Sequence, residues 1–511
     1  MTSFFMFTKV PSAAVLGLDC LPVIVEVDVA GSWPGYQIVG LPDTAIQEAK
    51  ERIRTAWKNS GLSFPANSRV IINLAPADLR KEGAAYDLPM ALGMYIATEK
   101  IETQIEDALF VGELALDGSL RHTTGILPLA LFAVEHGYKR LFIPSMNARE
   151  VVIISGIEIY PVENFSDLIA HICGQKLIQP LIPQPLNEWC EITNYEVDMA
   201  LVKGQEYVKR ALEIAASGAH NILLSGPPGS GKTLLARALP SILPPLTKHE
   251  AIEVTKIYSV AGLLGEDQPL ISERPFRSPH HSASGVALVG GGKFPRPGEI
   301  SLSHRGVLFL DEFPEFPRSV LESLRQPLED GIVTISRAQG TLTFPAQFTL
   351  VASQNPCPCG YATDPDRKCV CSPMQIVKYQ KKISGPLLDR IDLHIEVPRV
   401  EFDKLSGEAS TEPSDEIRAR VMAARERQAR RFSGSNCVTN SEMKNKEIKE
   451  FCALGETSIS LLRQAVSHLH LSARSYHRIL KLARTIADLA ASDKIETHHI
   501  AEALQYRPKI D

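Results

Sequence analysis

Apolar and polar residues alternate in short stretches along the first third of the chain, and this pattern predicts strands between helices. Residues 22–29 and 68–74 alternate as half-buried strands do. Residues 43–59 have helical spacing and begin at Asp43, a residue type that favours the N-cap position. We therefore expect an α/β domain over residues 1–172.

Closely spaced prolines after residue 179 interrupt this pattern, because proline removes a backbone donor and stiffens the chain. We expect a linker over residues 173–194. A second α/β unit follows over residues 195–402, and residues 403–511 have an almost wholly helical pattern. The length of 511 residues and the 44% hydrophobic content agree with about three globular domains.

The 54 basic and 59 acidic residues give a net charge of −5. This excludes a protein that is basic throughout, yet allows a local basic channel for nucleic acid. No apolar run approaches the roughly 20 residues that span a bilayer, and the first residues lack the basic lead and cleavage site of a signal peptide. We expect a cytoplasmic protein with no membrane partner, whose nine cysteines are thiols or metal ligands.

The strongest motif lies between a buried strand at residues 220–225 and the beginning of a helix at residues 234–239. It fits the pattern Gly-x-x-x-x-Gly-Lys-Thr, whose glycines let backbone N–H groups converge on phosphate oxygens at a helix N-terminus. Lys232 would reach the β and γ phosphates of ATP, and the Thr233 hydroxyl would ligate Mg²⁺. The predicted nucleotide-binding residues are Gly226, Pro227, Pro228, Gly229, Ser230, Gly231, Lys232, Thr233 and Leu234.

Two further strands are expected to bring polar side chains to this site. The apolar residues 306–310 precede Asp311 and Glu312, and open α/β sheets bind ligands at the carboxyl ends of their strands. Asp311 would hold Mg²⁺, and Glu312 would act as general base on the water that attacks the γ phosphate. After the strand at residues 347–353, the amide of Asn355 could orient that water or serve only as a turn residue before proline.

Several long blocks resemble the magnesium-chelatase-like branch of the AAA+ ATPases, and most specifically the ComM/YifB family. The blocks are residues 203–206, 219–224, 276–282, 298–306, 355–360 and 384–393. The resemblance implies a hexameric, ATP-driven DNA helicase that promotes branch migration during integration of single-stranded DNA, in natural transformation and homologous recombination. Its implied partners are single-stranded or branched DNA, further copies of the chain and recombination proteins.

The same resemblance assigns roles to three polar residues. Asn355 would be sensor 1, and Arg390 would be an arginine finger that reaches the γ phosphate bound by a neighbouring subunit. A structural salt bridge from Arg390 to a flanking aspartate is the alternative. Arg474 would be sensor 2, with Arg478 as the second candidate.

Residues 1–172 resemble the proteolytic domain of Lon-type proteases without its Ser–Lys dyad. Ala85 stands where the nucleophile belongs, and residues 118–134, which should hold the lysine, contain none. Covalent catalysis needs the hydroxyl and its base, so we expect an assembly or DNA-positioning module. The expected fold is a Lon-like α+β domain, an AAA+ α/β core with a parallel sheet, and a C-terminal α-helical lid.

Four cysteines form two Cys-x-Cys pairs close together in sequence: Cys357, Cys359, Cys369 and Cys371. Four thiolates suit a structural Zn²⁺ site with no open position, although Cys-x-x-Cys spacing is more usual. Unliganded thiols are the alternative. His280 and His281 are further candidates for ligands, or else loop residues.

Two loops and a helix carry basic residues that could meet DNA phosphates without reading sequence. Residues 277–296 are rich in glycine and include Lys293 and Arg296, and residues 331–344 are typical of a β-hairpin. The arginine-rich residues 418–431 form the helix. Solvated loops and a solvated helix face are the alternatives.

Two other functions stay open from the sequence. One is a metal-chelatase-type motor subunit, and the other is a regulatory or scaffold protein that uses ATP only to assemble. The four-cysteine segment and the Lon-like domain argue against the first. The intact Glu312 and Arg390 argue against the second.

Overall fold

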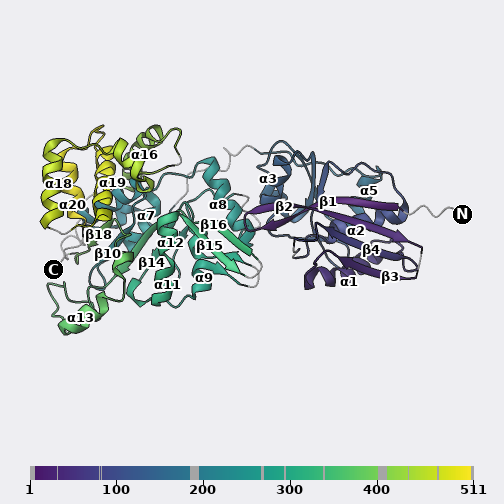
Figure 1. Cartoon of the computed structure of the whole chain (residues 1–511), viewed down its shortest axis with the longest axis horizontal. Helices are drawn as coiled ribbons and strands as arrows, with labels where there is room; N and C mark the ends of the chain where they lie inside the picture. The colour runs from purple at the N-terminus through teal and green to yellow at the C-terminus, as the bar shows by residue number, and fades with distance from the viewer. Residues whose placement is uncertain are drawn as a thin grey trace. The chain divides into compact units, whose positions relative to one another are not determined.

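The architecture is that of a computed structural model, which describes residues 6–507 except 32, 80, 82, 185–194, 266–269, 293–294, 338–339, 401–410, 436 and 469–470. The chain separates into two units (Figure 1), Met1–Glu191 with Lys248–Ser272 and Ile192–Thr247 with Glu273–Asp511. The end of the expected linker and the expected boundary after residue 402 lie outside the described residues.

The first unit contains a four-stranded sheet in the order β1-β2-β4-β3. Its strands are β1 (Met6–Leu16), β2 (Asp19–Ala30), β3 (Gly35–Val39) and β4 (Arg69–Ala75), of which β3 and β4 pair in parallel and the other neighbours antiparallel. Helices α1 (Thr44–Asn59) and α2 (Asp87–Glu99) share a hydrophobic core with the sheet. The Asp43 side chain caps α1 by accepting from Ile46 N at 2.8 Å, which confirms the predicted N-cap.

A smaller parallel sheet completes the first unit. It consists of β5 (Ala108–Phe110), β8 (Arg140–Pro144) and β9 (Glu158–Val162), with a hairpin of β6 (Glu113–Leu114) and β7 (Leu120–Arg121) and helices α3 (Ile126–Glu135), α4 (Ala148–Val151) and α5 (Phe165–Ile172). Helix α8 (Lys248–Ala261) also belongs here, although segments of the second unit flank it in sequence. The buried Glu150 carboxylate joins the parts, because it accepts from Leu127 N of α3 and from Ser259 Oγ of α8.

The second unit is built on a five-stranded sheet in the order β11-β14-β17-β10-β18, in which every pairing is parallel. The strands are β10 (Ile222–Ser225), β11 (Phe276–Arg277), β14 (Val307–Leu310), β17 (Thr349–Gln354) and β18 (Leu393–Glu396). β14 is buried along its whole length, as expected of a central parallel strand. Helices α6 (Glu206–Gly218) and α7 (Lys232–Ile242) precede and follow β10. The predicted parallel α/β core is confirmed.

Short elements lie between the strands of this sheet. Before β14 come α9 (Gly285–Val289), the pair β12 (Gly290–Gly291) and β13 (Arg296–Pro297), and α10 (Glu299–Leu302). After it come α11 (Arg318–Ser323), α12 (Arg325–Asp330) and the antiparallel pair β15 (Ile332–Arg337) and β16 (Gly340–Pro345), which confirms the predicted hairpin. α13 (Pro373–Gln380) and α14 (Gly385–Leu388) precede β18.

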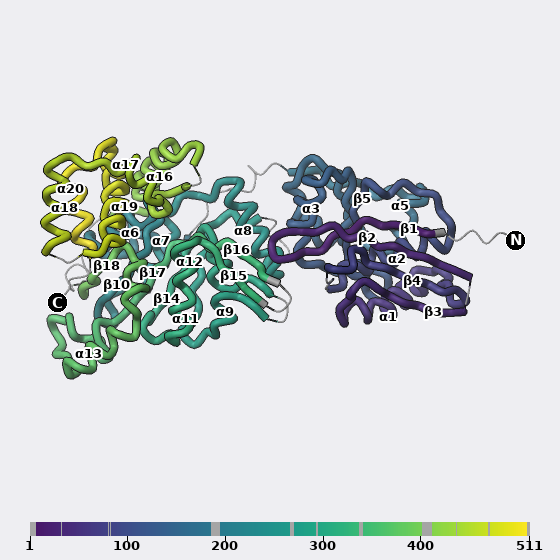
Figure 2. The backbone as a smooth tube through the Cα atoms, in the orientation of Figure 1, coloured from purple at the N-terminus to yellow at the C-terminus, as the bar shows by residue number. Residues whose placement is uncertain are grey.

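The C-terminal part is helical, as predicted, and its helices gather beside β10 and β18 (Figure 2). They are α16 (Ser414–Arg431), α17 (Asn445–Phe451), α18 (Glu456–His468), α19 (Ala473–Leu489) and α20 (Thr497–Gln505). Their apolar faces share one core with α6 and α7. Among the described residues, no helix combines the length and the apolar character needed to cross a bilayer.

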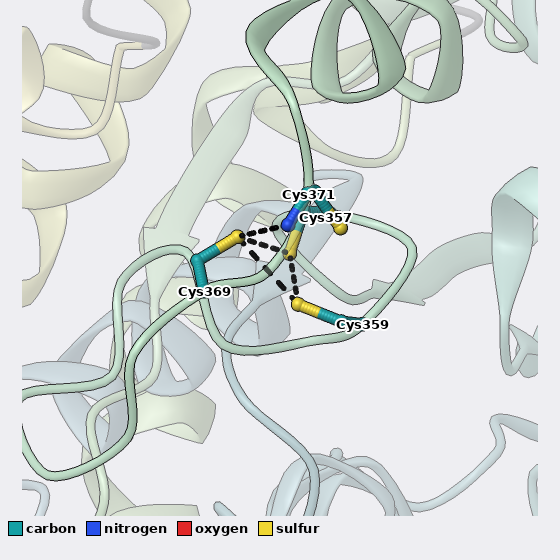
Figure 3. Close-up of side chains that lie close together, drawn as sticks. All are labelled: Cys357, Cys359, Cys369 and Cys371. Atoms are coloured by element: carbon teal, nitrogen blue, oxygen red, sulfur yellow. Dashed lines mark hydrogen bonds between the residues drawn. The ribbon is translucent and has the colours of Figure 1, made fainter.

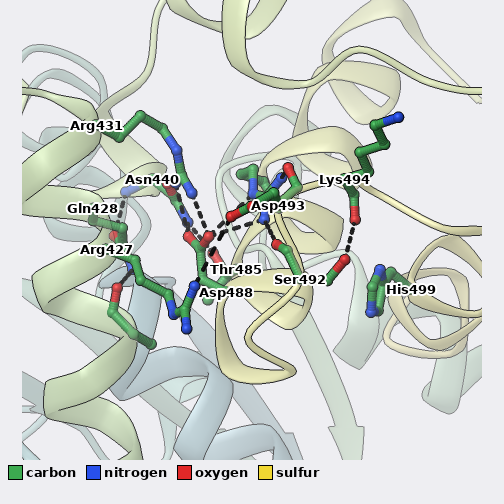
Figure 4. A network of polar contacts seen from close by, with 12 residues as sticks. Arg427, Gln428, Arg431, Asn440, Thr485, Asp488, Ser492, Asp493, Lys494 and His499 are labelled. Carbon is green, nitrogen blue, oxygen red and sulfur yellow. Dashed lines mark hydrogen bonds and ion pairs between the residues drawn. The ribbon is translucent and has the colours of Figure 1, made fainter.

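A buried polar network ties these helices to the sheet (Figure 4). Asp488 accepts from Arg431 and, at 2.8 Å, from Asn440 Nδ2, whose amide also donates to Thr485 Oγ1 at 3.0 Å. Thr485 Oγ1 in turn lies 2.7 Å from Nε2 of His220, the residue two before β10. The network therefore runs from the helical part to the strand that leads into the glycine-rich motif.

Candidate nucleotide site

The glycine-rich motif forms a tight loop between β10 and α7. Gly229 and Gly231 have φ of +77° and +87°, a left-handed conformation that favours glycine. A Cβ at Gly226 would lie 2.3 Å from the Val397 carbonyl oxygen, so no side chain fits there. The loop lines an open cavity of about 390 Å³ with Asp311, Glu312, Ser353, Gln354 and Asn355. The strand order thus gathers the predicted phosphate loop and acidic residues in one place.

Lys232 begins α7 and is buried under the loop. Its ammonium donates to the carbonyls of Gly226 at 2.8 Å and Pro227 at 2.9 Å, and lies 3.3 Å from Asn355 Oδ1. Burial lowers the pKa of Lys232, while the Asp311 carboxylate acts in the opposite direction. The contact with Asn355 joins the loop to the end of β17, as the strand order predicts.

Thr233 and Asp311 meet at the mouth of this loop. Thr233 Oγ1 donates to Asp311 Oδ2 at 3.0 Å. Asp311 Oδ1 accepts from the Ser353 hydroxyl and, at 3.0 Å, from Glu312 N. A hydroxyl beside a carboxylate supplies the oxygen ligands that Mg²⁺ prefers, so the donor set fits this metal.

Ser353 was not among the predicted site residues. It lies on β17, which pairs with β14 so that Leu310 is opposite Ala352. Asp311 follows Leu310 and Ser353 follows Ala352, so these two residues are also neighbours. This explains their contact. The signal in the sequence is a hydroxyl residue near the end of β17, the strand next to the one that leads into Asp311.

Glu312 has a φ of +52°, a left-handed conformation that is rare for a residue with a side chain. Its side chain is 56% exposed, and Oε2 lies 3.3 Å from His281 Nδ1. His281 follows β11, the strand next to β14. The sequence suggests a metal ligand or a loop residue at this position, and in the structure His281 contacts the predicted general base.

Arg390 and Arg474 converge on one carboxylate. Arg390 Nη2 binds Glu329 of α12 and its Nη1 donates to Pro386 O at 2.7 Å, while Arg474 Nη2 donates to the other Glu329 oxygen at 3.0 Å. The ion pair of Arg390 is thus with Glu329. Arg478 is largely buried 3.6 Å from Asp392, and burial lowers the pKa of Arg478.

The four predicted cysteines cluster, as the sequence suggested (Figure 3). Their sulfur atoms all lie within 4.8 Å of one another. Cys357 Sγ is 3.3 Å from Cys359 Sγ and 3.7 Å from Cys369 Sγ, and the latter two are 3.5 Å apart. All four are free thiols. Hydrogen bonds from the backbone of Tyr361 and Val370 lower the pKa of the Cys359 thiol to about 6.

The basic helix α16 uses many of its arginines for packing. Arg420 binds Glu213 and Glu412, and Arg431 binds Asp488. Arg418 and Arg425 donate to backbone carbonyls of the core. These contacts weigh against α16 as a free surface for DNA.

Family models cover most of the chain. "Magnesium chelatase, subunit ChlI" matches residues 198–405, "Subunit ChlI of Mg-chelatase" matches residues 25–147, and "Magnesium chelatase, subunit ChlI C-terminal" matches residues 411–507. The parallel sheet, the phosphate loop and these matches define a magnesium-chelatase-like AAA+ ATPase.

Comparison with individual proteins identifies a smaller family within this class. The chain is 43% identical to Competence protein ComM of Haemophilus influenzae, over 98% of its own length and 97% of ComM. It is equally similar, 43%, to the uncharacterized protein YifB of Salmonella typhimurium over 98% of its length and 96% of YifB. The Magnesium-chelatase 67 kDa subunit of Heliobacterium mobile is 26% identical over 31% of the chain and 28% of that subunit. The chain belongs to the ComM/YifB family. Membership in the AAA+ ATPases implies ATP and Mg²⁺ as its ligands.

Proposed function

We propose that this protein is an ATP-driven DNA helicase that assembles as a hexamer and promotes branch migration while single-stranded DNA is integrated. The observation that carries the proposal is the convergence of Lys232, Thr233, Asp311 and Asn355 on one loop, in a chain that is 43% identical to a competence protein over 98% of its residues. The experiment that tests it is a three- or four-strand branch-migration assay with the purified chain, with and without ATP.

The proposed reaction is hydrolysis of the γ phosphate by water. Lys232, held beside the loop carbonyls, would bind the phosphates, and Thr233 and Asp311 would hold Mg²⁺, which would neutralise phosphate charge when bound. Glu312, exposed to solvent, would take the proton from the attacking water. Asn355, 3.3 Å from the Lys232 ammonium, would orient that water.

The proposed site is shared between subunits. Arg390 would act on the γ phosphate bound by the neighbouring subunit, and Arg474 would act from the helical part of its own chain. Their common contact with Glu329 supports a joint role, because it brings both guanidinium groups to one carboxylate.

Two loops are proposed to grip DNA. A Cβ at Gly290 would lie 3.0 Å from Ile335 Cδ1, so the β12–β13 segment and the β15–β16 hairpin pack together. Arg296 is exposed on the first of them. Lys293 and the turn of the hairpin lie outside the described residues. Adjacent loops of this kind would contact phosphates in a salt-sensitive manner.

We also propose that Cys357, Cys359, Cys369 and Cys371 hold a structural Zn²⁺ ion. Four thiolates about 2.3 Å from Zn²⁺ stand about 3.8 Å apart in a tetrahedron. The closest sulfur pairs are 3.3–3.7 Å apart, so the donor set fits the metal with small movements. Elemental analysis should find one zinc per chain, and its absence would leave the thiols as the correct interpretation.

The helicase proposal and the chelatase alternative predict that different partners raise the rate of ATP hydrolysis. DNA should stimulate the proposed helicase, whereas a chelatase motor would respond to a porphyrin-binding partner. A chain that forms rings with ATP but does not hydrolyse it would support the regulatory alternative.

A further inference from the structure

The cysteine cluster rests directly on the phosphate loop. Gly360 closes the turn around Cys359, and its N–H donates to Cys357 O at 3.0 Å. A Cβ at Gly360 would lie 2.6 Å from Pro228 Cδ, and φ at this glycine is +87°. No side chain therefore separates the cysteine turn from the loop that would bind phosphate.

The cluster is also joined to Asn355 along the chain. Asn355 follows the last residue of β17, and only Pro356 separates it from Cys357. Cys357 is fully buried, so this end of the cluster is fixed in the core. Asn355 therefore lies two residues from a cysteine of the cluster that is anchored in the core.

Helix α13 provides a second connection to Asn355. It begins after Cys371 with a capping box formed by Ser372 and Gln375. Tyr379, near its end, is buried, and the backbone N–H of Asn355 lies close enough to its hydroxyl to lower the pKa of Tyr379. Burial has the larger effect and raises the pKa of Tyr379 to about 12, so the hydroxyl stays neutral across the physiological range. Asn355 is therefore held from both ends of the cysteine segment.

We propose that a metal ion on the four cysteines fixes Asn355 and the phosphate loop in the geometry needed for ATP hydrolysis. Tyr379 and Gly360 are then positioning residues for the nucleotide site. The inference rests on the proposed ATPase function and adds a dependence of turnover on this metal. Its physical basis is a chain of contacts from the sulfur cluster through Asn355 to the Lys232 ammonium, 3.3 Å from Asn355 Oδ1.

Tyr379→Phe separates this role from metal binding and folding, because it removes one hydroxyl and no sulfur. We expect kcat for basal ATP hydrolysis to fall about tenfold, as for residues one step removed from a metal. Zinc content should stay at one per chain, and ATP affinity should stay within about threefold. Tyr361→Phe is the matched control, because Tyr361 lies in the same segment and its hydroxyl accepts from Arg367 at 3.0 Å. It should hydrolyse ATP like the unaltered chain.

A spectroscopic measurement tests the coupling independently, in case Tyr379→Phe lowers kcat only because the variant is partly unfolded. Co²⁺ replaces Zn²⁺ in the full-length chain, and its thiolate absorption is followed while a non-hydrolysable ATP analogue is added. A change in the band upon nucleotide binding supports the coupling. An unaltered band together with unaltered kcat in Tyr379→Phe would overturn it.

The two proposals fail separately. Neither basal hydrolysis nor the cobalt band requires DNA, so absence of DNA stimulation would reject the helicase and leave the coupling standing. Conversely, a chain that is freed of metal by a chelator and still shows full DNA-stimulated hydrolysis would retain the helicase and reject the coupling.

Discussion

Arg390 and Arg474 share a single partner, because each binds one carboxylate oxygen of Glu329. Arg390 precedes β18 and is 11% exposed, whereas Arg474 lies near the start of α19 and is 46% exposed. The predicted arginine finger and the predicted sensor 2 arginine, from distant parts of the sequence, thus meet on one acidic side chain.

Arg390→Ala should lower ATP turnover by about 10³ or more, because it removes a cation that would neutralise charge in the transition state. ATP binding should change little, since the nucleotide would be held by the phosphate loop of another subunit. Steady-state hydrolysis and titration with a fluorescent nucleotide measure the two effects. Equal losses of binding and turnover would point to a structural role instead.

Mixing subunits tests whether Arg390 acts between them. Arg390→Ala chains keep Glu312, and Glu312→Gln chains keep Arg390. A mixed ring therefore contains some sites in which both groups are intact, and turnover should exceed that of either variant alone. No recovery at any mixing ratio would mean that both residues act within one subunit.

Glu312→Gln should keep ATP binding and ring formation but lower hydrolysis by about 10² to 10⁴, the range for removal of a general base. Glu315→Gln is a suitable control, because Glu315 lies on the short helical turn that follows Glu312 and binds the exposed Lys382 at 2.9 Å. Single-turnover hydrolysis and size-exclusion chromatography with ATP provide the readouts. Unchanged turnover would remove Glu312 from the reaction.

Gly226→Ala should abolish nucleotide binding, because the new methyl group would lie 2.3 Å from the Val397 carbonyl oxygen. We expect a loss of stability of about 2 kcal/mol, as for other overpacked sites. Gly229→Ala offers a comparison, since nothing lies near its Cβ and only the left-handed φ is unfavourable, by about 1 kcal/mol. Binding by Gly226→Ala as tight as by Gly229→Ala would contradict the packing argument.

The first unit should lose stability as pH rises from about 4 to 6, because of Asp87. Burial raises the pKa of Asp87 to about 6 despite its ion pair with Arg52, whereas an unfolded chain has about 3.9. The folded state therefore binds more protons in this window. The contribution of protonated Asp87 to the free energy of unfolding is complete below pH 4. Up to about 3 kcal/mol of it is lost as pH rises to 6.

Asp87→Asn should remove this pH dependence, so its stability relative to the unaltered chain should improve as pH rises from 4 to 6. Fluorescence of Trp57, which lies in the same core, follows the unfolding. The exposed Asp19→Asn variant should retain the dependence. Parallel stability curves for Asp87→Asn and the unaltered chain would show that Asp87 does not titrate in this window.

Local patterns were enough to predict the parallel core, the β15–β16 hairpin and the C-terminal helices. The alternation of side chains, the N-cap at Asp43 and the glycine-rich loop each depend on residues close together in sequence. Contacts between distant segments were not accessible in this way. The contact of His281 with Glu312 requires the order of the strands, and the place of α8 in the first unit requires packing against α3.

By itself, the sequence determined which residues could bind a nucleotide and a thiolate metal, because motif spacing fixes backbone conformation over a few residues. Only the tertiary structure decided that Ser353 supports Asp311, that Glu329 gathers two arginines and that Gly360 touches Pro228. The physical reason is that strand order and side-chain packing set distances between residues far apart in the chain, and no local pattern records those distances.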